Sequence, residues 1–161
     1  MDQSTPDTAR RVLLAHGVPP ALLDSVTAAG SPFRLLAWGK PNLGRASELE
    51  SLVPALAGIC PLAEEDGEAV VGLLPASNRF VRYYYEDGRL GDAAIELLGT
   101  GYDQFAATIL LQFEEGGLGD EFDEAARILA FRQVDELRRL LDTEPYDDEA
   151  VELFRTSLAG R

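Results

Sequence analysis

The stretch Ala69-Val70-Val71-Gly72-Leu73-Leu74, followed after four residues by Arg79-Phe80-Val81-Arg82-Tyr83-Tyr84-Tyr85-Glu86, decides the fold. Branched and aromatic residues of this kind favour a pleated surface, and the Pro-Ala-Ser-Asn segment between the two runs is typical of a turn. We therefore predict a β-hairpin. Asp87-Gly88 and Gly91-Asp92 separate it from residues 94–98, which predict a third strand or a short helix.

A helix follows the third segment closely. Its apolar residues recur at helical spacing and form one continuous stripe: Tyr102, Phe105, Ala106, Ile109, Leu110 and Phe113. This pattern predicts an amphipathic helix, with Thr100 as its N-cap and Asp103 three residues later. We expect a sheet with this helix lying across it.

The chain has 161 residues, which predicts one domain that buries a core without metal or disulfide support. Its 28 acidic and 14 basic residues give a formal net charge of −14. Nucleic acids and anionic membranes are disfavoured as partners, since both need a positive surface. Two explanations of the acidity stay open: it keeps the protein soluble, or it attracts a basic partner.

The compartment is predicted from cysteine usage and from the N-terminus. Cys60 is the single cysteine, so an intramolecular disulfide framework is excluded. The first seven residues have neither a basic nor an apolar region, and no later run approaches the roughly 18 apolar residues of a membrane span. We expect a cytoplasmic protein.

Two short helices are predicted before the sheet. The first begins at Thr5-Pro6-Asp7 and ends at Gly17, and the second begins at Pro19-Pro20 and ends at residues 30–32. Residues 33–38 form a short apolar run stopped by Gly39, which predicts a strand rather than a helix.

The segment before the hairpin is less regular. We predict a loop over residues 39–45 and a weak helix over residues 47–56, interrupted by Pro54. Residues 59–63 predict an edge-type strand, because Pro61 cannot donate to a central ladder. The acidic turn at residues 64–67 would then join this strand to the hairpin.

After Phe113 the sequence becomes helical and more acidic. Residues 114–120 resemble a linker, and helical apolar spacing then continues almost to the end, with a last helix predicted at about residues 147–158. From Glu114 onward 14 acidic residues face 6 basic ones. We treat residues 114–161 as an acidic helical C-terminal extension of a single domain spanning residues 1–161.

No complete catalytic or metal-binding motif is found. His16 is the only histidine and is expected at a helix C-terminus, where its charge suits the dipole. A Cys60–His16 dyad is a formal alternative, but Cys60 precedes Pro61 in an apolar run, which is typical of a buried, inert thiol. The chain lacks the ligands of a structural zinc and the twelve-residue calcium loop, so we predict no metal and no cofactor.

The run Tyr83-Tyr84-Tyr85 is the most informative aromatic feature. Alternation along a strand sends Tyr84 to one face, with Phe80, and Tyr83 and Tyr85 to the other, with Val81. Two interpretations stay open: these tyrosines have their hydroxyls at the rim of a core, or they contribute to a protein interface, where tyrosine is enriched.

Several of these segments together resemble the SUKH superfamily. The resemblance covers residues 6–113 and is carried by the hairpin, by the predicted apolar strand at residues 33–38 and by three motifs: His16-Gly17-Val18-Pro19, Ile59-Cys60-Pro61-Leu62 with its acidic turn, and Gly101-Tyr102-Asp103-Gln104-Phe105. It implies an α+β domain with a single, mainly antiparallel sheet flanked by helices. It also implies a protein without an active site, since many bacterial members are immunity proteins that neutralise a toxin, often a nuclease.

From the resemblance and the acidity together we expect a non-enzymatic immunity-type protein whose partner is a protein, such as a basic toxin domain. The predicted contacts are Glu64, Glu65, Asp66, Glu68, Tyr83, Tyr85, Glu86 and Asp87. One alternative is a regulatory or scaffold domain of the same fold. Another is a small acid-catalysed hydrolase, which would need a deep pocket with two convergent carboxylates or a strongly perturbed ionisable group.

Overall fold

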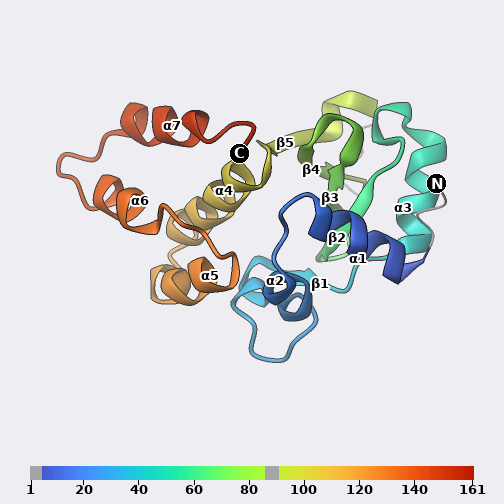
Figure 1. The fold of residues 1–161 in the computed structure, drawn as a ribbon, viewed down its shortest axis with the longest axis horizontal. Helices are drawn as coiled ribbons and strands as arrows, with labels where there is room; N and C mark the ends of the chain where they lie inside the picture. The colour runs from blue at the N-terminus through green and yellow to red at the C-terminus, as the bar shows by residue number, and fades with distance from the viewer. Residues whose placement is uncertain (1–4, 86–90) are drawn as a thin grey trace.

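The computed structural model describes residues 5–85 and 91–161. The strands of these residues form a single five-stranded sheet in the order β1-β2-β3-β4-β5, with every neighbouring pair antiparallel. Helices lie on both sides of the sheet (Figure 1). The predicted α+β class, with a mainly antiparallel sheet and flanking helices, is confirmed.

The sheet is a meander in which each strand pairs with the next one along the chain. Its strands are β1 (Trp38–Gly39), β2 (Cys60–Glu65), β3 (Ala69–Leu74), β4 (Arg79–Tyr84) and β5 (Ile95–Thr100). The predicted hairpin is β3 and β4, which pair from Ala69 opposite Tyr84 to Leu74 opposite Arg79. β3 is therefore the central strand, which agrees with its near-continuous burial.

The strand that contains Pro61 adapts to its proline. The register of β2 against β3 shifts between Pro61 and Ala63, as expected where a residue cannot donate to the ladder. Opposite Pro61 stands Gly72, and a Cβ atom there would lie only 2.8 Å from the carbonyl oxygen of Cys60. Only glycine permits this close approach of the two backbones.

Helix α4 (Tyr102–Glu115) covers one face of the sheet with the predicted apolar stripe. The ring of Phe105 stacks on that of Phe80 in β4, with 4.5 Å between their centroids. It also stacks on the Trp38 ring, with 6.4 Å between centroids. Phe33 then connects Trp38 to Phe113, at 5.4 and 5.7 Å. This aromatic row is the centre of the main core.

Helix α3 (Leu43–Leu52) lies on the opposite face and completes a second, smaller core. Figure 1 shows α3 and α4 on opposite sides of the sheet. The second core contains Leu49 of α3, Val70 of β3, and Val81 and Tyr83 of β4. The predicted alternation along β4 is therefore correct: Phe80 faces α4, and Val81 and Tyr83 face α3.

The N-terminal segment adds two helices to the main core. Helix α1 (Pro6–Ala15) begins as predicted, with the Thr5 hydroxyl accepting from the Thr8 backbone N–H at 3.3 Å. It is followed by the short α2 (Pro20–Ser25). Leu13 of α1 and Leu22 of α2 are almost completely buried in the same cluster as the aromatic row.

The C-terminal helices α5 (Phe122–Ile128), α6 (Val134–Leu141) and α7 (Asp148–Ser157) lie beyond α4, away from the sheet (Figure 1). Most of their buried residues, including Leu137 and Phe154, belong to the main core cluster. The chain end returns to α4: the Asp103 N–H donates to the Arg161 carbonyl at 3.2 Å. Residues 114–161 are thus an extension in sequence that shares the core of the preceding part.

Three local predictions need correction. Residues 33–38 do not form one strand. A 3₁₀ helix (Pro32–Leu36) occupies most of the segment, because Pro32 favours a helical start and the Ser31 hydroxyl accepts from the Phe33 N–H, and only Trp38 belongs to the two-residue β1. The predicted loop over residues 39–45 ends earlier than expected. Asn42 caps α3 by accepting from the Arg45 N–H at 2.9 Å, so the helix begins at Leu43.

The third correction concerns the start of α4. Gly101, with a φ of +87°, occupies the N-cap position in place of Thr100. Instead of Asp103 reaching back, Gln104 does so: its side-chain oxygen accepts from the Thr100 N–H at 2.7 Å. Residues 95–100 form a strand, which decides between the two structures that the sequence allowed there.

Candidate functional site

The predicted contact residues lie around the turn between β2 and β3, but they differ in how accessible they are. Glu65 is occupied within the fold, because its Oε2 accepts from Arg82 Nε at 2.8 Å and from Trp38 Nε1 at 3.2 Å. It belongs to the ionic interactions of the α4 face and is not free for a partner.

Arg82 is the centre of these interactions, and only 5% of it is exposed. Besides Glu65, it donates to Glu96 Oε2 and to the side-chain oxygen of Gln112 in α4, both at 2.9 Å. Burial opposes its charge, but the carboxylates of Glu65 and Glu96 outweigh burial and raise its pKa. The group thus fixes α4 to β2, β4 and β5.

Tyr84 lies beside this arginine. Its hydroxyl donates to Glu96 at 3.3 Å, and the Arg82 guanidinium lies 5.9 Å from its ring centroid. Burial first, and then the carboxylates of Glu96 and Glu65, raise its pKa against the opposing effect of Arg82. The tyrosine therefore stays neutral at physiological pH and acts as a hydrogen-bond donor.

Glu64 precedes Glu65 in β2 but lies on the α3 side of the sheet, where its environment is different. Its Oε1 accepts from the Tyr85 hydroxyl, and the guanidinium of Arg45 lies 4.9 Å from the Tyr85 ring centroid. Its Oε2 is buried and makes no hydrogen bond within the described residues. Burial raises the pKa of Glu64, although the Asn42 backbone and Arg45 oppose this effect.

Two of the predicted contacts point outward. Asp66 and Glu68 are exposed at the tip of the turn, where their carboxylates have no ion pair with another described residue. Tyr83 is only 2% exposed and packs in the second core, so its prediction as a contact is corrected. Tyr85 is half-buried, and Glu86 and Asp87 lie outside the described residues.

The two groups of the hypothetical dyad have separate partners. The Cys60 thiol donates to the Ala9 carbonyl at 3.2 Å, and burial raises its pKa to about 12 despite an opposing backbone hydrogen bond. His16 instead lies 3.1 Å from the Asn78 side-chain oxygen through Nδ1. The thiol is therefore protonated and buried, as predicted for an inert cysteine.

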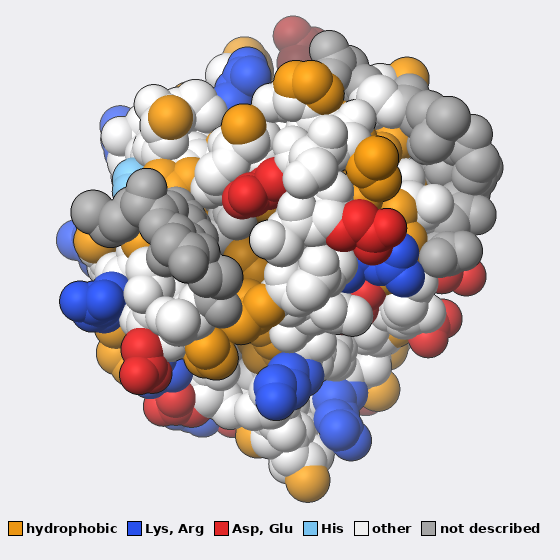
Figure 2. Space-filling view, turned by 90° about the vertical axis from the view of Figure 1, so that its right-hand side faces the viewer, with side chains coloured by type: hydrophobic (Ala, Val, Ile, Leu, Met, Phe, Trp, Pro, Cys, Tyr) orange, Lys and Arg blue, Asp and Glu red, His pale blue; other side chains and the backbone are white. Residues whose placement is uncertain are grey.

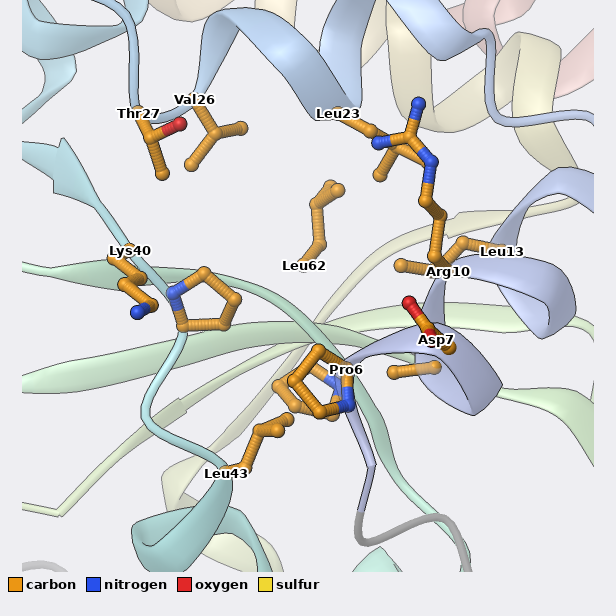
Figure 3. Close-up of a pocket in the computed structure, with 13 residues that line it drawn as sticks. Pro6, Asp7, Arg10, Leu13, Leu23, Val26, Thr27, Lys40, Leu43 and Leu62 are labelled. Atoms are coloured by element: carbon orange, nitrogen blue, oxygen red, sulfur yellow. The ribbon is translucent and has the colours of Figure 1, made fainter.

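A mostly apolar groove of about 220 Å³ opens between α1, α2 and residues 40–43. Figure 3 shows Leu62 at its floor, with Arg10 and Lys40 on opposite sides. Arg10 forms an ion pair with Asp24 at 2.9 Å. Figure 2, which looks onto the α3 side of the molecule, shows apolar side chains gathered in a hollow of this face.

A surface that the predictions missed lies at the other end of the molecule. We define the acidic C-terminal face by the exposed residues Glu114, Glu115, Asp142, Glu144, Tyr146, Asp147 and Asp148. Tyr146 is 51% exposed. Burial raises the pKa of Tyr146, and so do the negative charges of Asp148, Glu115 and Glu114. Because Glu114 and Glu115 are the last residues of α4, the end of α4 lies beside the α6–α7 loop. The charge excess after Glu114 was the sequence signal for this face.

Two carboxylates of this face share a hollow. Glu114 and Asp142 line a space of about 180 Å³ together with Phe122 and Arg138. Both acids are exposed. An acid/base pair for hydrolysis normally needs at least one desolvated carboxylate, so this hollow gives the hydrolase alternative little support.

In residues 5–85 and 91–161, no cluster of three or more histidine, cysteine or acidic side chains is arranged to hold a metal ion. Within the same ranges, no helix is both long and apolar enough to cross a bilayer.

No family model matches the chain, and neither the curated proteins nor the solved structures contain a significant match to it.

Proposed function

We propose that this chain is a non-enzymatic protein-binding domain of the SUKH immunity type, which binds a basic toxin domain and blocks it. The observation that carries the proposal is the acidic C-terminal face, where six exposed carboxylates surround a half-exposed tyrosine. Clustered carboxylates attract a positively charged partner and accelerate its association, and tyrosine is enriched among the residues that dominate binding energy.

The support comes from both charge and fold. Among the described residues, no basic side chain forms an ion pair with these six carboxylates, although Asp147 also caps α7 by accepting from the Ala150 N–H at 3.0 Å. The carboxylates of Glu65 and Glu96, in contrast, are held by Arg82. Nuclease toxins bind a polyanion and so carry a positive cleft. An acidic face of this kind would cover such a cleft. The α+β architecture is the one that the resemblance implies.

The contacts predicted at the β2–β3 turn are not all available to a partner. Asp66 and Glu68 remain available at the β2–β3 turn, but Glu64 and Glu65 serve the fold. We therefore assign the main contact to the C-terminal face and a secondary one to the turn.

The test is co-expression with the product of the adjacent gene, followed by affinity purification of the complex. We expect a basic protein to co-purify in equal amounts, and we expect this chain to suppress its toxicity in cells. Purification of a non-toxic host protein instead would favour the regulatory or scaffold alternative. Absence of any interaction with the neighbouring product would contradict the immunity proposal.

A further inference from the structure

The apolar groove between α1, α2 and residues 40–43 exists because the sheet is incomplete on this side. Strand β1 pairs with only the last two residues of β2. The chain then leaves the sheet at Pro41, which cannot donate to a ladder. Helix α1 lies beside the start of β2 instead, and the Cys60 thiol donates to its Ala9 carbonyl at 3.2 Å. The groove is the space between α1 and the departing chain.

The floor of the groove is apolar and preformed. Leu13, Val26 and Leu62 line it, and each is only 2% exposed because it also belongs to the main core. The ion pair of Arg10 with Asp24, at 2.9 Å, joins α1 to α2 along one side. An apolar ligand can therefore bind here without a large cost for ordering the protein.

Three prolines restrict the kind of apolar ligand that suits the groove. Pro6, Pro41 and Pro61 all line it, and a proline has no backbone N–H. An extended peptide that added a strand to β2 would lack a donor at Pro61 and at Pro41 opposite. A sugar or a nucleotide would need several convergent polar groups. An aliphatic chain needs no such donors and fits these walls.

The charges at the rim differ between the two sides of the groove (Figure 3). On one side Arg10 is already paired with Asp24, and Asp7 adds a negative charge. On the other side Lys40 is exposed and forms no ion pair or hydrogen bond with a described residue. The Thr27 hydroxyl lies on the same side as Lys40. Charge complementarity therefore favours a ligand whose anionic end lies at Lys40.

The size of the groove sets the length of the chain that it can hold. Its volume is about 220 Å³, and one water molecule takes roughly 30 Å³ of the liquid. The groove therefore has room for about seven non-hydrogen atoms of a ligand. Each methylene group that enters it leaves water and adds to the affinity.

We propose that the groove binds a medium-chain fatty acid of about eight carbons. The alkyl chain lies on Leu62, and the carboxylate lies at the mouth beside Lys40 and Thr27. The net charge of −14 disfavours a bilayer with anionic lipids, so the ligand is a free acid in solution. This inference does not depend on the proposed immunity function.

The test is isothermal titration calorimetry at about pH 7, where carboxylates are ionised, with octanoate, butanoate and octylammonium as probes. We expect octanoate to bind with a Kd of about 1 mM or tighter. Butanoate has a shorter chain and should bind at least about tenfold more weakly. Octylammonium has the same chain with the opposite charge and should bind several-fold more weakly than octanoate. Failure of octanoate to bind at about 5 mM, or equal affinity for octylammonium, would overturn the proposal.

The position of the carboxylate is tested at Lys40. Lys40→Glu should reverse the preference, so that octylammonium binds more tightly than octanoate. The matched control is Arg34→Glu, which makes the same change in charge at an exposed position outside the groove and should keep the original preference. The same reversal in both variants would show an effect of net charge alone and would contradict the placement at Lys40.

Lys40 also offers a direct readout, because it is the only lysine of the chain. Reductive methylation with ¹³C labels this side chain together with the N-terminus and keeps the charge of the lysine. The Lys40 methyl signal should shift on addition of octanoate, with the Kd found by calorimetry. Octanoate binding that leaves this signal unchanged would contradict the placement of the carboxylate.

The groove itself is tested by filling it. Leu23→Trp, at a half-buried lining position of α2, should weaken octanoate binding at least about tenfold. Leu14→Trp, at a 37% exposed position outside the groove, is the control and should keep the affinity. If circular dichroism shows Leu23→Trp unfolded, Thr27→Trp at the exposed rim provides the obstruction. Unchanged affinity in the folded variant would overturn the proposal, and so would a dimer of the chain, seen by sedimentation velocity, that the same variant disrupts.

Discussion

The β2–β3 turn and the acidic C-terminal face are both rich in carboxylates, but they use them differently. At the turn, Glu65 is shared by Arg82 and Trp38, and Glu64 accepts from Tyr85. On the C-terminal face, Glu144, Asp147 and their neighbours are exposed. Acidity alone therefore does not identify a binding surface, because a carboxylate that holds the fold together is unavailable to a partner.

The contrast follows from the neighbouring elements. Glu64 and Glu65 end a strand that packs against helices, so Glu65 pairs with the buried Arg82 and the charge of Arg45 in α3 acts on Glu64. The residues of the α6–α7 loop are exposed, and the chain contains no basic residue between residues 140 and 154. The charges of this loop face water, where they attract a basic partner over about a Debye length.

The largest expected effect comes from removing the buried cation of the first region. Arg82→Ala should lower the free energy of unfolding by about 3–5 kcal/mol, because it leaves the carboxylates of Glu65 and Glu96 without their partner. Chemical denaturation with circular dichroism detection measures this loss. Arg79→Ala, at an exposed position of the same strand, is the control and should change stability by less than about 0.5 kcal/mol. Equal effects of the two variants would show that the ionic group contributes little.

A smaller loss is expected at Glu65. Glu65→Gln keeps an oxygen for Arg82 and Trp38 but removes the charge, so we expect a loss of about 1 kcal/mol at pH 7. Thermal unfolding monitored by calorimetry checks it. An unchanged midpoint would mean that hydrogen bonding, without charge, accounts for the contact.

The smallest expected effect is a gain in stability instead of a loss, and it concerns Glu64, next to Glu65. Burial raises the pKa of Glu64 above its ordinary 4.5, so its contribution to stability is complete below that value and is lost as the pH rises through the folded-state pKa. Glu64→Gln should therefore stabilise the protein at pH 7, but only by about 0.3 kcal/mol, because water screens this half-buried group. At about pH 4 the gain should vanish. Denaturation curves at the two pH values measure the difference, and a loss of stability at pH 7 would contradict the role of burial.

The sequence was sufficient for the parts of the fold that depend on local pattern. Alternation predicted which side of β4 each residue faces, and helical spacing predicted the buried stripe of α4. The strand expected at residues 33–38 was wrong because a short apolar run suits a 3₁₀ helix equally well when Ser31 and Pro32 begin it. Short segments of this kind are decided by tertiary packing, with Phe33 completing the aromatic row.

The candidate site was harder to predict than the fold. Sequence alone could not show that Arg82 holds Glu65, since the two residues are 17 positions apart and meet only across the sheet. It also could not show that Tyr83 lies under α3. The charge excess after Glu114 was visible, but its gathering beside Tyr146 depends on how the α6–α7 loop approaches the end of α4.

The most direct test of the account compares neutralised variants of the two regions in binding to the basic product of the adjacent gene. One variant is Glu144→Gln/Asp148→Asn on the C-terminal face, and the matched variant, which removes the same number of charges, is Asp66→Asn/Glu68→Gln at the turn. Stopped-flow association at low ionic strength measures both. We predict that the first variant associates about tenfold more slowly, that the second changes by less than about threefold, and that the difference shrinks at high salt. A slower rate for the turn variant alone, or no change in either, would contradict the assignment of binding to the acidic C-terminal face.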